Sequence, residues 1–111
     1  MRLLVAAALI AVLAGGAIAQ TATEPTAQER RGEALLMRLC QGCHAVGRTG
    51  ASTNPEAPAF RTLGQRYRIE ALEEALAEGG LASGHSDMPD FGFTAEEVGE
   101  VIAYLNAIQQ R

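Results

Sequence analysis

A five-residue run, Cys-Gln-Gly-Cys-His at residues 40–44, constrains this chain more than any other feature. Its two thiols are three positions apart, so they lie about one helical turn from each other and can reach the same flat cofactor. A Cys-x-x-Cys-His run is typical of covalent attachment of a c-type haem, in which both cysteines form thioethers. The imidazole of His44 is then held against one face of the ring and can ligate the iron.

Two other interpretations of the cysteine pair remain open. A redox-active disulfide of the thioredoxin kind follows a strand in a βαβ pattern, whereas the residues on both sides of this pair look helical. A structural zinc site needs further ligands, yet the chain has no other Cys, and its only other His is His85. The motif therefore favours haem over both.

Two features downstream make the chain resemble a small class I cytochrome c. They are the Met88-Pro89 pair and a closing helical segment that contains Tyr104. The resemblance covers about residues 26–110. It implies an all-α, cytochrome c-like fold in which three main helices and long loops surround one covalently bound haem c. The four-helix cytochrome c′ type is disfavoured, because its attachment motif lies near the C-terminus.

The beginning of the chain has the pattern of a cleaved export signal. A positive start precedes an apolar run at 3–14 and an A-x-A site at 17–19. A retained membrane anchor is the alternative, although residues 3–19 are only 17 residues, at the short end of the roughly 17 to 25 that span a bilayer. We expect a signal peptide at 1–19, a disordered lead at 20–25 and a cytochrome c domain at 26–111. Export predicts a bacterial periplasmic location.

Helical periodicity predicts three helices, at about 27–41, 69–78 and 95–109. Capping boxes at Thr26–Glu29 and Thr94–Glu97 predict the starts of the first and last. Gly79-Gly80 predicts the end of the middle one.

Gly32 is unusual inside the first helix, because a mid-helix glycine costs about 1 kcal/mol relative to alanine. In the resembling family a glycine eight residues before the first attachment cysteine lets the first and last helices cross, and Gly32 has this offset from Cys40. The family usually has an aromatic four residues later, where this chain has Leu36. Tyr104 matches the family's aromatic residue in the last helix, which packs near the first helix. The alternatives are that Gly32 has no structural role and that Tyr104 is exposed.

The resemblance also implies a distal iron ligand from a downstream loop. Met88 is the candidate, because Met37 precedes Cys40 on the attachment side and is expected in the core. Pro89 restricts Met88 to extended geometry. His85 is the rival ligand, and a bis-His iron would have a lower reduction potential than a His/Met iron.

A proline carbonyl that binds the free ring nitrogen of the ligating His is a further implied contact. Pro58 is the candidate, Pro55 is close by, and Pro58 could instead only begin a short helical turn through Leu63. Possible donors to the haem propionates are Arg61, Arg66, Tyr67 and Arg68.

The net charge of the chain restricts the classes of molecule that it can bind. The chain has thirteen Asp and Glu against nine Arg and no Lys, a net charge of −4 at pH 7, which argues against nucleic acid. Five arginines lie between Arg38 and Arg68, whereas nine acids follow Ile69. These charges are either solvated helix faces or a docking surface for a transient redox partner.

The features together predict a monomeric electron carrier with no catalytic residue and no membrane-spanning mature form. Its redox protein partners would dock transiently through small interfaces. A haem subunit of a dehydrogenase complex, and a sensor or peroxidase-like protein whose Met88 leaves the iron, are the alternatives.

The chain has only five aromatic residues and no Trp, so a buried porphyrin would fill a large part of its core. We expect the Cys40→Ser, Cys43→Ser double variant to lose helical circular dichroism, because it cannot retain that group. A cooperative, native-like unfolding transition in this variant would contradict the expectation.

Overall fold

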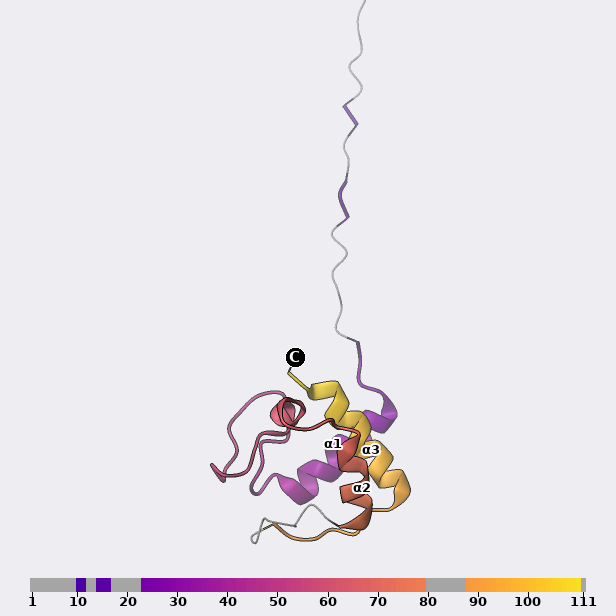
Figure 1. Ribbon diagram of the computed structural model, residues 1–111. Helices are drawn as coiled ribbons and strands as arrows, with labels where there is room; N and C mark the ends of the chain where they lie inside the picture. The colour runs from indigo at the N-terminus through magenta and orange to yellow at the C-terminus, as the bar shows by residue number, and fades with distance from the viewer. Residues whose placement is uncertain (1–9, 12–13, 17–22, 80–87, 111) are drawn as a thin grey trace, which may run out of the picture.

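The computed structural model describes residues 10–11, 14–16, 23–79 and 88–110 (Figure 1). The elements in chain order are α1 (Ala27–Cys40), the 3-10 helix η1 (Phe60–Gln65), α2 (Ala71–Glu78) and α3 (Ala95–Ile108). These ranges contain helices and no strand, which confirms the predicted all-α class. Most of the expected signal segment and all of His85 lie outside the described residues, so these expectations stay predictions.

The capping boxes begin α1 and α3 as predicted. At α1 the Glu29 amide donates to Thr26 Oγ1 (3.1 Å) and the Thr26 amide donates to the Glu29 carboxylate (2.8 Å). The Thr94–Glu97 pair repeats this arrangement at 3.2 and 2.9 Å. Each box satisfies two backbone amides that have no partner inside the helix.

The middle helix begins slightly later than predicted. Residues 68–70 form a tight turn in which the amides of Ala71 and Leu72 donate three residues back, so α2 starts at Ala71. It ends as predicted at Gly79, whose φ of 73° is left-handed and favours glycine.

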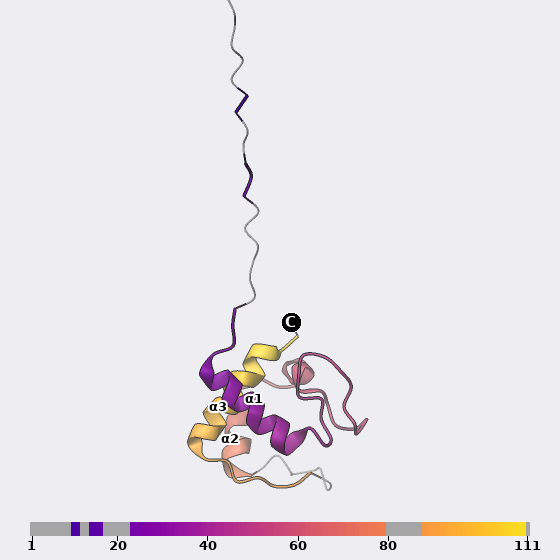
Figure 2. The same cartoon turned by 180° about the vertical axis from the view of Figure 1, so that it is seen from behind.

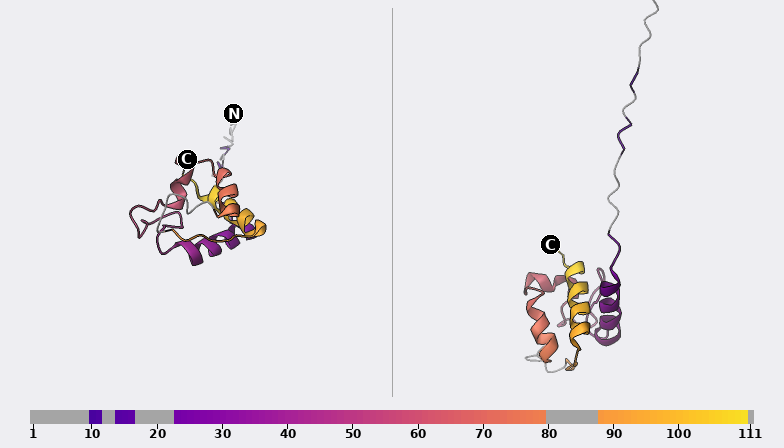
Figure 3. Two further views of the ribbon diagram at one scale, coloured as in Figure 1. Left: turned by 60° about the horizontal axis from the view of Figure 1, so that its bottom comes forward. Right: turned by 90° about the vertical axis from the view of Figure 1, so that its right-hand side faces the viewer.

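α3 lies between α1 and α2 (Figure 3), and α1 crosses α3 (Figure 2). At the crossing, a Cβ built on Gly32 would collide with the backbone carbonyl oxygen of Glu100 and lie 3.0 Å from Tyr104 Cβ. The close approach expected at Gly32 is therefore present, and Tyr104 packs there as predicted. Arg31 Nε donates to the Glu100 carboxylate at 2.6 Å beside this contact.

The core forms around α3, which contacts α1, α2 and η1. Its buried apolar residues are Leu35, Leu36, Val46, Phe60, Ile69, Leu76, Val98, Val101, Tyr104, Leu105 and Ile108. Met37 does not join them, since 41% of it is exposed, and its expected core position is wrong. At 100° per residue it lies about 140° around α1 from Gly32, and so away from α3. No helix among the residues described is long and apolar enough to span a membrane.

We expect Gly32→Ala to destabilise the haem-loaded protein by about 1–3 kcal/mol, because the added methyl group meets backbone atoms that cannot move independently. Denaturant unfolding measures this loss. Gly99→Ala on α3 is the matched control: its Cβ would lie an ordinary 3.5 Å from Gln28 Nε2, so helix propensity should leave stability equal or raise it by up to about 1 kcal/mol. Equal effects of the two substitutions would contradict the close crossing.

Candidate functional site

A cleft of about 560 Å³ opens between α1, the segment that follows it, η1, α2 and residues 88–93. This volume is within the range of about 300–1,000 Å³ that is typical of cofactor sites. Its walls are mostly apolar, and α1, α2, η1 and α3 all contribute to them. The apolar residues that these helices contribute are Leu36, Leu39, Phe60, Leu63, Leu72, Leu76, Val101 and Leu105.

Both motif cysteines line the cleft at the end of α1. The amides of Cys43 and His44 donate to the Cys40 carbonyl at 3.2 and 3.0 Å, so a further tight turn continues beyond the helix. Both thiols are free; Cys40 is half-buried and Cys43 is exposed. Burial, with a smaller contribution from Cys43, raises the pKa of the Cys40 thiol to about 11. The Cys40 sulfur is therefore a protonated thiol at neutral pH.

His44 lines the same cleft, and its ring is held from one side. Nδ1 donates to the Pro58 carbonyl oxygen at 2.8 Å, and the ring centroid lies 4.6 Å from that of Phe60. Because a carbonyl oxygen only accepts, Nδ1 carries the proton and Nε2 of the neutral ring keeps its lone pair. The hydrogen bond implied for a proline is thus made by Pro58, while Pro55 lies outside the wall of the cleft.

The loop after His44 is held by hydrogen bonds that the sequence did not indicate. The Tyr104 hydroxyl donates to the Val46 carbonyl at 2.9 Å, although 58 positions separate the two residues. The Ala45 amide donates to Ser52 Oγ at 3.0 Å, which closes the base of the loop. Tyr104 was expected only to pack against the first helix, and no local pattern predicts which carbonyl its hydroxyl reaches.

Met88 is half-buried and lines the same cleft, together with Pro89 and Phe91. The Asp90 carboxylate lies against Gly79 at the end of α2, where a Cβ would be 2.5 Å from Asp90 Oδ1. The structure therefore brings Met88 and His44 into one cleft from positions far apart in the sequence.

Of the four candidate donors to propionates, only Arg66 and Tyr67 line the cleft, and 51% of Tyr67 is exposed. Arg61 and Arg68 do not line it. Within the described part of the chain, the buried Nη1 of Arg61 has no hydrogen-bond partner. Which of the four side chains line the cleft depends on the path of η1, and the spacing of the residues in the sequence did not predict that path.

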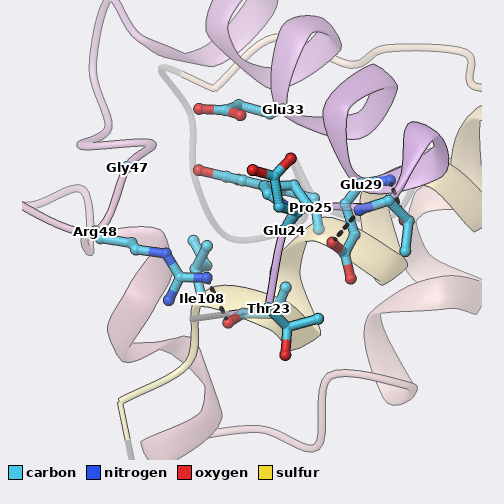
Figure 4. A pocket seen from close by; sticks show the side chains of 11 residues that line it. Thr23, Glu24, Pro25, Glu29, Glu33, Gly47, Arg48 and Ile108 are labelled. Carbon is cyan, nitrogen blue, oxygen red and sulfur yellow. Dashed lines mark hydrogen bonds between the residues drawn. The ribbon is translucent and has the colours of Figure 1, made fainter. Parts of the chain in front are cut away.

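Arg48 belongs to a separate cavity of about 480 Å³ that shares no lining residue with the cleft. Figure 4 shows its guanidinium, which donates to the Ala107 carbonyl at 3.0 Å, opposite Glu24 and Glu33. This arginine connects the loop after His44 to the end of α3.

The residues of the cleft fit a covalently attached haem. Two free thiols, a ring nitrogen with a lone pair and a thioether sulfur converge on apolar walls, which matches the donors of a c-type site. Over residues 23–79 and 88–110, no three His, Cys, Asp or Glu side chains come together as they would around a metal ion.

Burial raises the pKa of Tyr104 above its ordinary value of 10; Glu33 raises it further and Arg48 opposes the shift. The folded protein keeps this hydroxyl protonated, so its contribution to stability is complete below the unfolded pKa of about 10 and is lost as the pH rises through the folded pKa. We expect Tyr104→Phe to cost about 1 kcal/mol at neutral pH and to flatten the alkaline decline. Denaturant unfolding of the haem-loaded protein between about pH 7 and about pH 11 tests this.

Tyr67→Phe is the comparison variant, because it removes the other tyrosine hydroxyl of the chain, which is exposed and makes no hydrogen bond within the described residues. Since Tyr67 lines the cleft, this variant is compared only in the steepness of its alkaline decline, which should equal that of the wild type. The chain has no Lys to titrate in this range. An alkaline decline that Tyr104→Phe leaves unchanged would contradict the role of the Val46 contact.

Comparison with known proteins supports the same assignment. The family model described as Cytochrome C oxidase, cbb3-type, subunit III matches residues 27–105, from the first residue of α1 into α3. No curated protein and no solved structure matched the chain. The matched range is more than half of the chain and includes the attachment motif, His44 and Met88. The chain therefore belongs to this family of small c-type cytochromes, and membership implies covalently bound haem c and a part in electron transfer.

Proposed function

We propose that this chain is an exported electron carrier with one haem, attached through Cys40 and Cys43 and ligated by His44 and Met88. The observation that supports this most is that His44 and Met88 share the wall of one cleft, while His44 Nδ1 is already bonded to Pro58. When bound, haem c supplies a one-electron couple between ferric and ferrous iron.

On the attachment side, the Pro58 carbonyl has two effects on His44. It fixes the tautomer that presents Nε2, and it increases the basicity of the imidazole, which favours the more highly charged metal. The ring of Phe60 restricts rotation of the imidazole. His44 is therefore oriented before any ligand reaches it.

On the distal side, Met88 presents a weak thioether ligand that needs a well-positioned loop. Pro89 disfavours a helical backbone conformation at Met88, the residue before it. Asp90 packs against the end of α2, and the rings of Phe91 and Phe93 lie 6.1 Å apart. These contacts support an ordered methionine, and a methionine ligand raises the reduction potential.

The remaining walls control the surroundings of the site. Apolar side chains from all three α-helices exclude water, and a dry environment favours the iron state of lower charge. Arg66 and Tyr67 provide polar donors at the wall for the carboxylates of a porphyrin. Because His44 and Met88 would both bind the iron in this proposal, it assigns no catalytic residue.

The export pattern at residues 1–19 and the family support a periplasmic location. Small, transient interfaces with redox proteins suit a carrier, which must release each partner quickly. Arg38, Arg66 and Arg68 are exposed and offer positive charge for such docking, whereas Arg48 is used within the fold.

The family description favours a second candidate, a haem subunit of a cytochrome c oxidase complex. The alternatives differ in how the protein is recovered from its native cell. A carrier elutes as a free monomer of the size expected for this chain, whereas a subunit co-purifies in a stable complex.

We expect Met88→Ala to abolish the near-infrared sulfur-to-iron charge-transfer band of the ferric protein, lower the reduction potential and allow carbon monoxide to bind to the ferrous protein. The wild-type protein should show the band and bind no carbon monoxide. Met37→Ala is the matched control, because Met37 is exposed on α1, away from the cleft. A wild-type spectrum without the band at neutral pH would overturn the assignment of Met88, and rapid carbon monoxide binding would favour a sensor or peroxidase-like role. An optical redox titration of the same samples supplies the potentials.

A further inference from the structure

The side chain of Gln109, the residue after α3, makes three hydrogen bonds. Nε2 donates to the carbonyl oxygens of Phe60 (2.8 Å) and Leu105 (2.7 Å), and Oε1 accepts from the Gly64 amide at 2.7 Å. The Leu105 contact satisfies a carbonyl in the last turn of α3, which is ordinary helix capping. The other two contacts are not local, because they reach 49 and 45 positions back along the chain.

These two contacts connect the end of α3 to both ends of η1. Phe60 is the first residue of η1 and Gly64 is near its last. The backbone amide of Gln110 adds a third connection, to the Arg61 carbonyl at 2.9 Å. Figure 1 shows the end of α3 beside η1, close to the C-terminal label. The amide group of Gln109 therefore makes two of the three hydrogen bonds between the end of α3 and η1 among the described residues.

The same end of η1 holds His44. The Phe60 amide donates to the Ala45 carbonyl at 3.0 Å, and the Phe60 ring lies against the imidazole. Pro58, which accepts from His44 Nδ1, is only two residues before Phe60. A shift of Phe60 would move the Pro58 acceptor and change the hydrogen bond to His44.

We propose that Gln109 is a positioning residue that sets the His44–Pro58 hydrogen bond and thereby the reduction potential, an inference that rests on the proposed function. The side chain is half-buried and Phe60 is 7% exposed, so the bonded carbonyl has little access to water as a substitute partner. The side-chain amide of Gln109 supplies both a hydrogen-bond donor and a hydrogen-bond acceptor. An apolar side chain of similar size supplies neither. A longer bond to Pro58 makes the imidazole less basic, which disfavours the ferric state and raises the potential.

The test compares Gln109→Met with Gln110→Met in the haem-loaded protein. Methionine keeps the length of glutamine and removes its hydrogen bonds. Gln110 is the matched control, because it is exposed and its side chain makes no hydrogen bond to any described residue. At the wild-type midpoint, Gln109→Met should raise the ferrous to ferric ratio at least threefold, about 28 mV at 59 mV per tenfold change for one electron. Gln110→Met should leave the ratio unchanged.

Hydrogen exchange of the His44 Nδ1 proton, followed by NMR, is the second measurement. Gln109→Met should speed this exchange at least threefold, whereas a merely structural role would lower the unfolding midpoint without changing the exchange or the potential. If Gln109→Met does not fold, the wild-type protein provides the test. If Gln109 couples the two sites, the His44 Nδ1 proton and the Gly64 amide of the wild-type protein should have protection factors within threefold of each other. Unrelated protection, or an unchanged potential in folded Gln109→Met, overturns the inference and leaves the proposed function intact. Wild-type protein without covalent haem overturns both.

Discussion

The close crossing of α1 and α3 is the contact on which the rest of the structure depends. It exists because Gly32 has no side chain where the Glu100 carbonyl passes. At this separation Leu36 of α1 and Val101 of α3 line the same cleft, and the end of α1 delivers Cys40 and the residues after it to that cleft. A larger separation would spread the walls of the site, since each wall is carried by a different helix.

The two axial ligand candidates are held by different kinds of contact. His44 lies in a polar loop with little apolar surface to bury, so hydrogen bonds position it, directly through Pro58 and indirectly through α3. Met88 instead lies in a segment in which Asp90 packs against Gly79 and the rings of Phe91 and Phe93 are close together. Because α3 contacts α1, α2 and η1, it positions the three other elements that line the cleft. This arrangement fits an electron-transfer site, in which the ligands should move little between the two redox states.

Much of the fold follows from local signals, and much of the site does not. The capping boxes and the left-handed Gly79 act within four residues of chain, so the helix ends were predicted almost to the residue. The exposed position of Met37 was missed, because proximity to the motif in sequence says nothing about which face of α1 is covered. The choice between Pro55 and Pro58 was also open, because it depends on the path of a glycine-rich and serine-rich loop.

The sequence by itself determined the helical class and most of the helix boundaries, since each of these depends on residue types at short, regular spacing. Only the tertiary structure decided which side chains surround the site. The contacts from Tyr104 to Val46 and from Gln109 to Phe60 join residues 58 and 49 positions apart. No local preference of the backbone encodes such pairs, because they form only after the packing of α1 against α3 has placed the loop and η1 within hydrogen-bond distance.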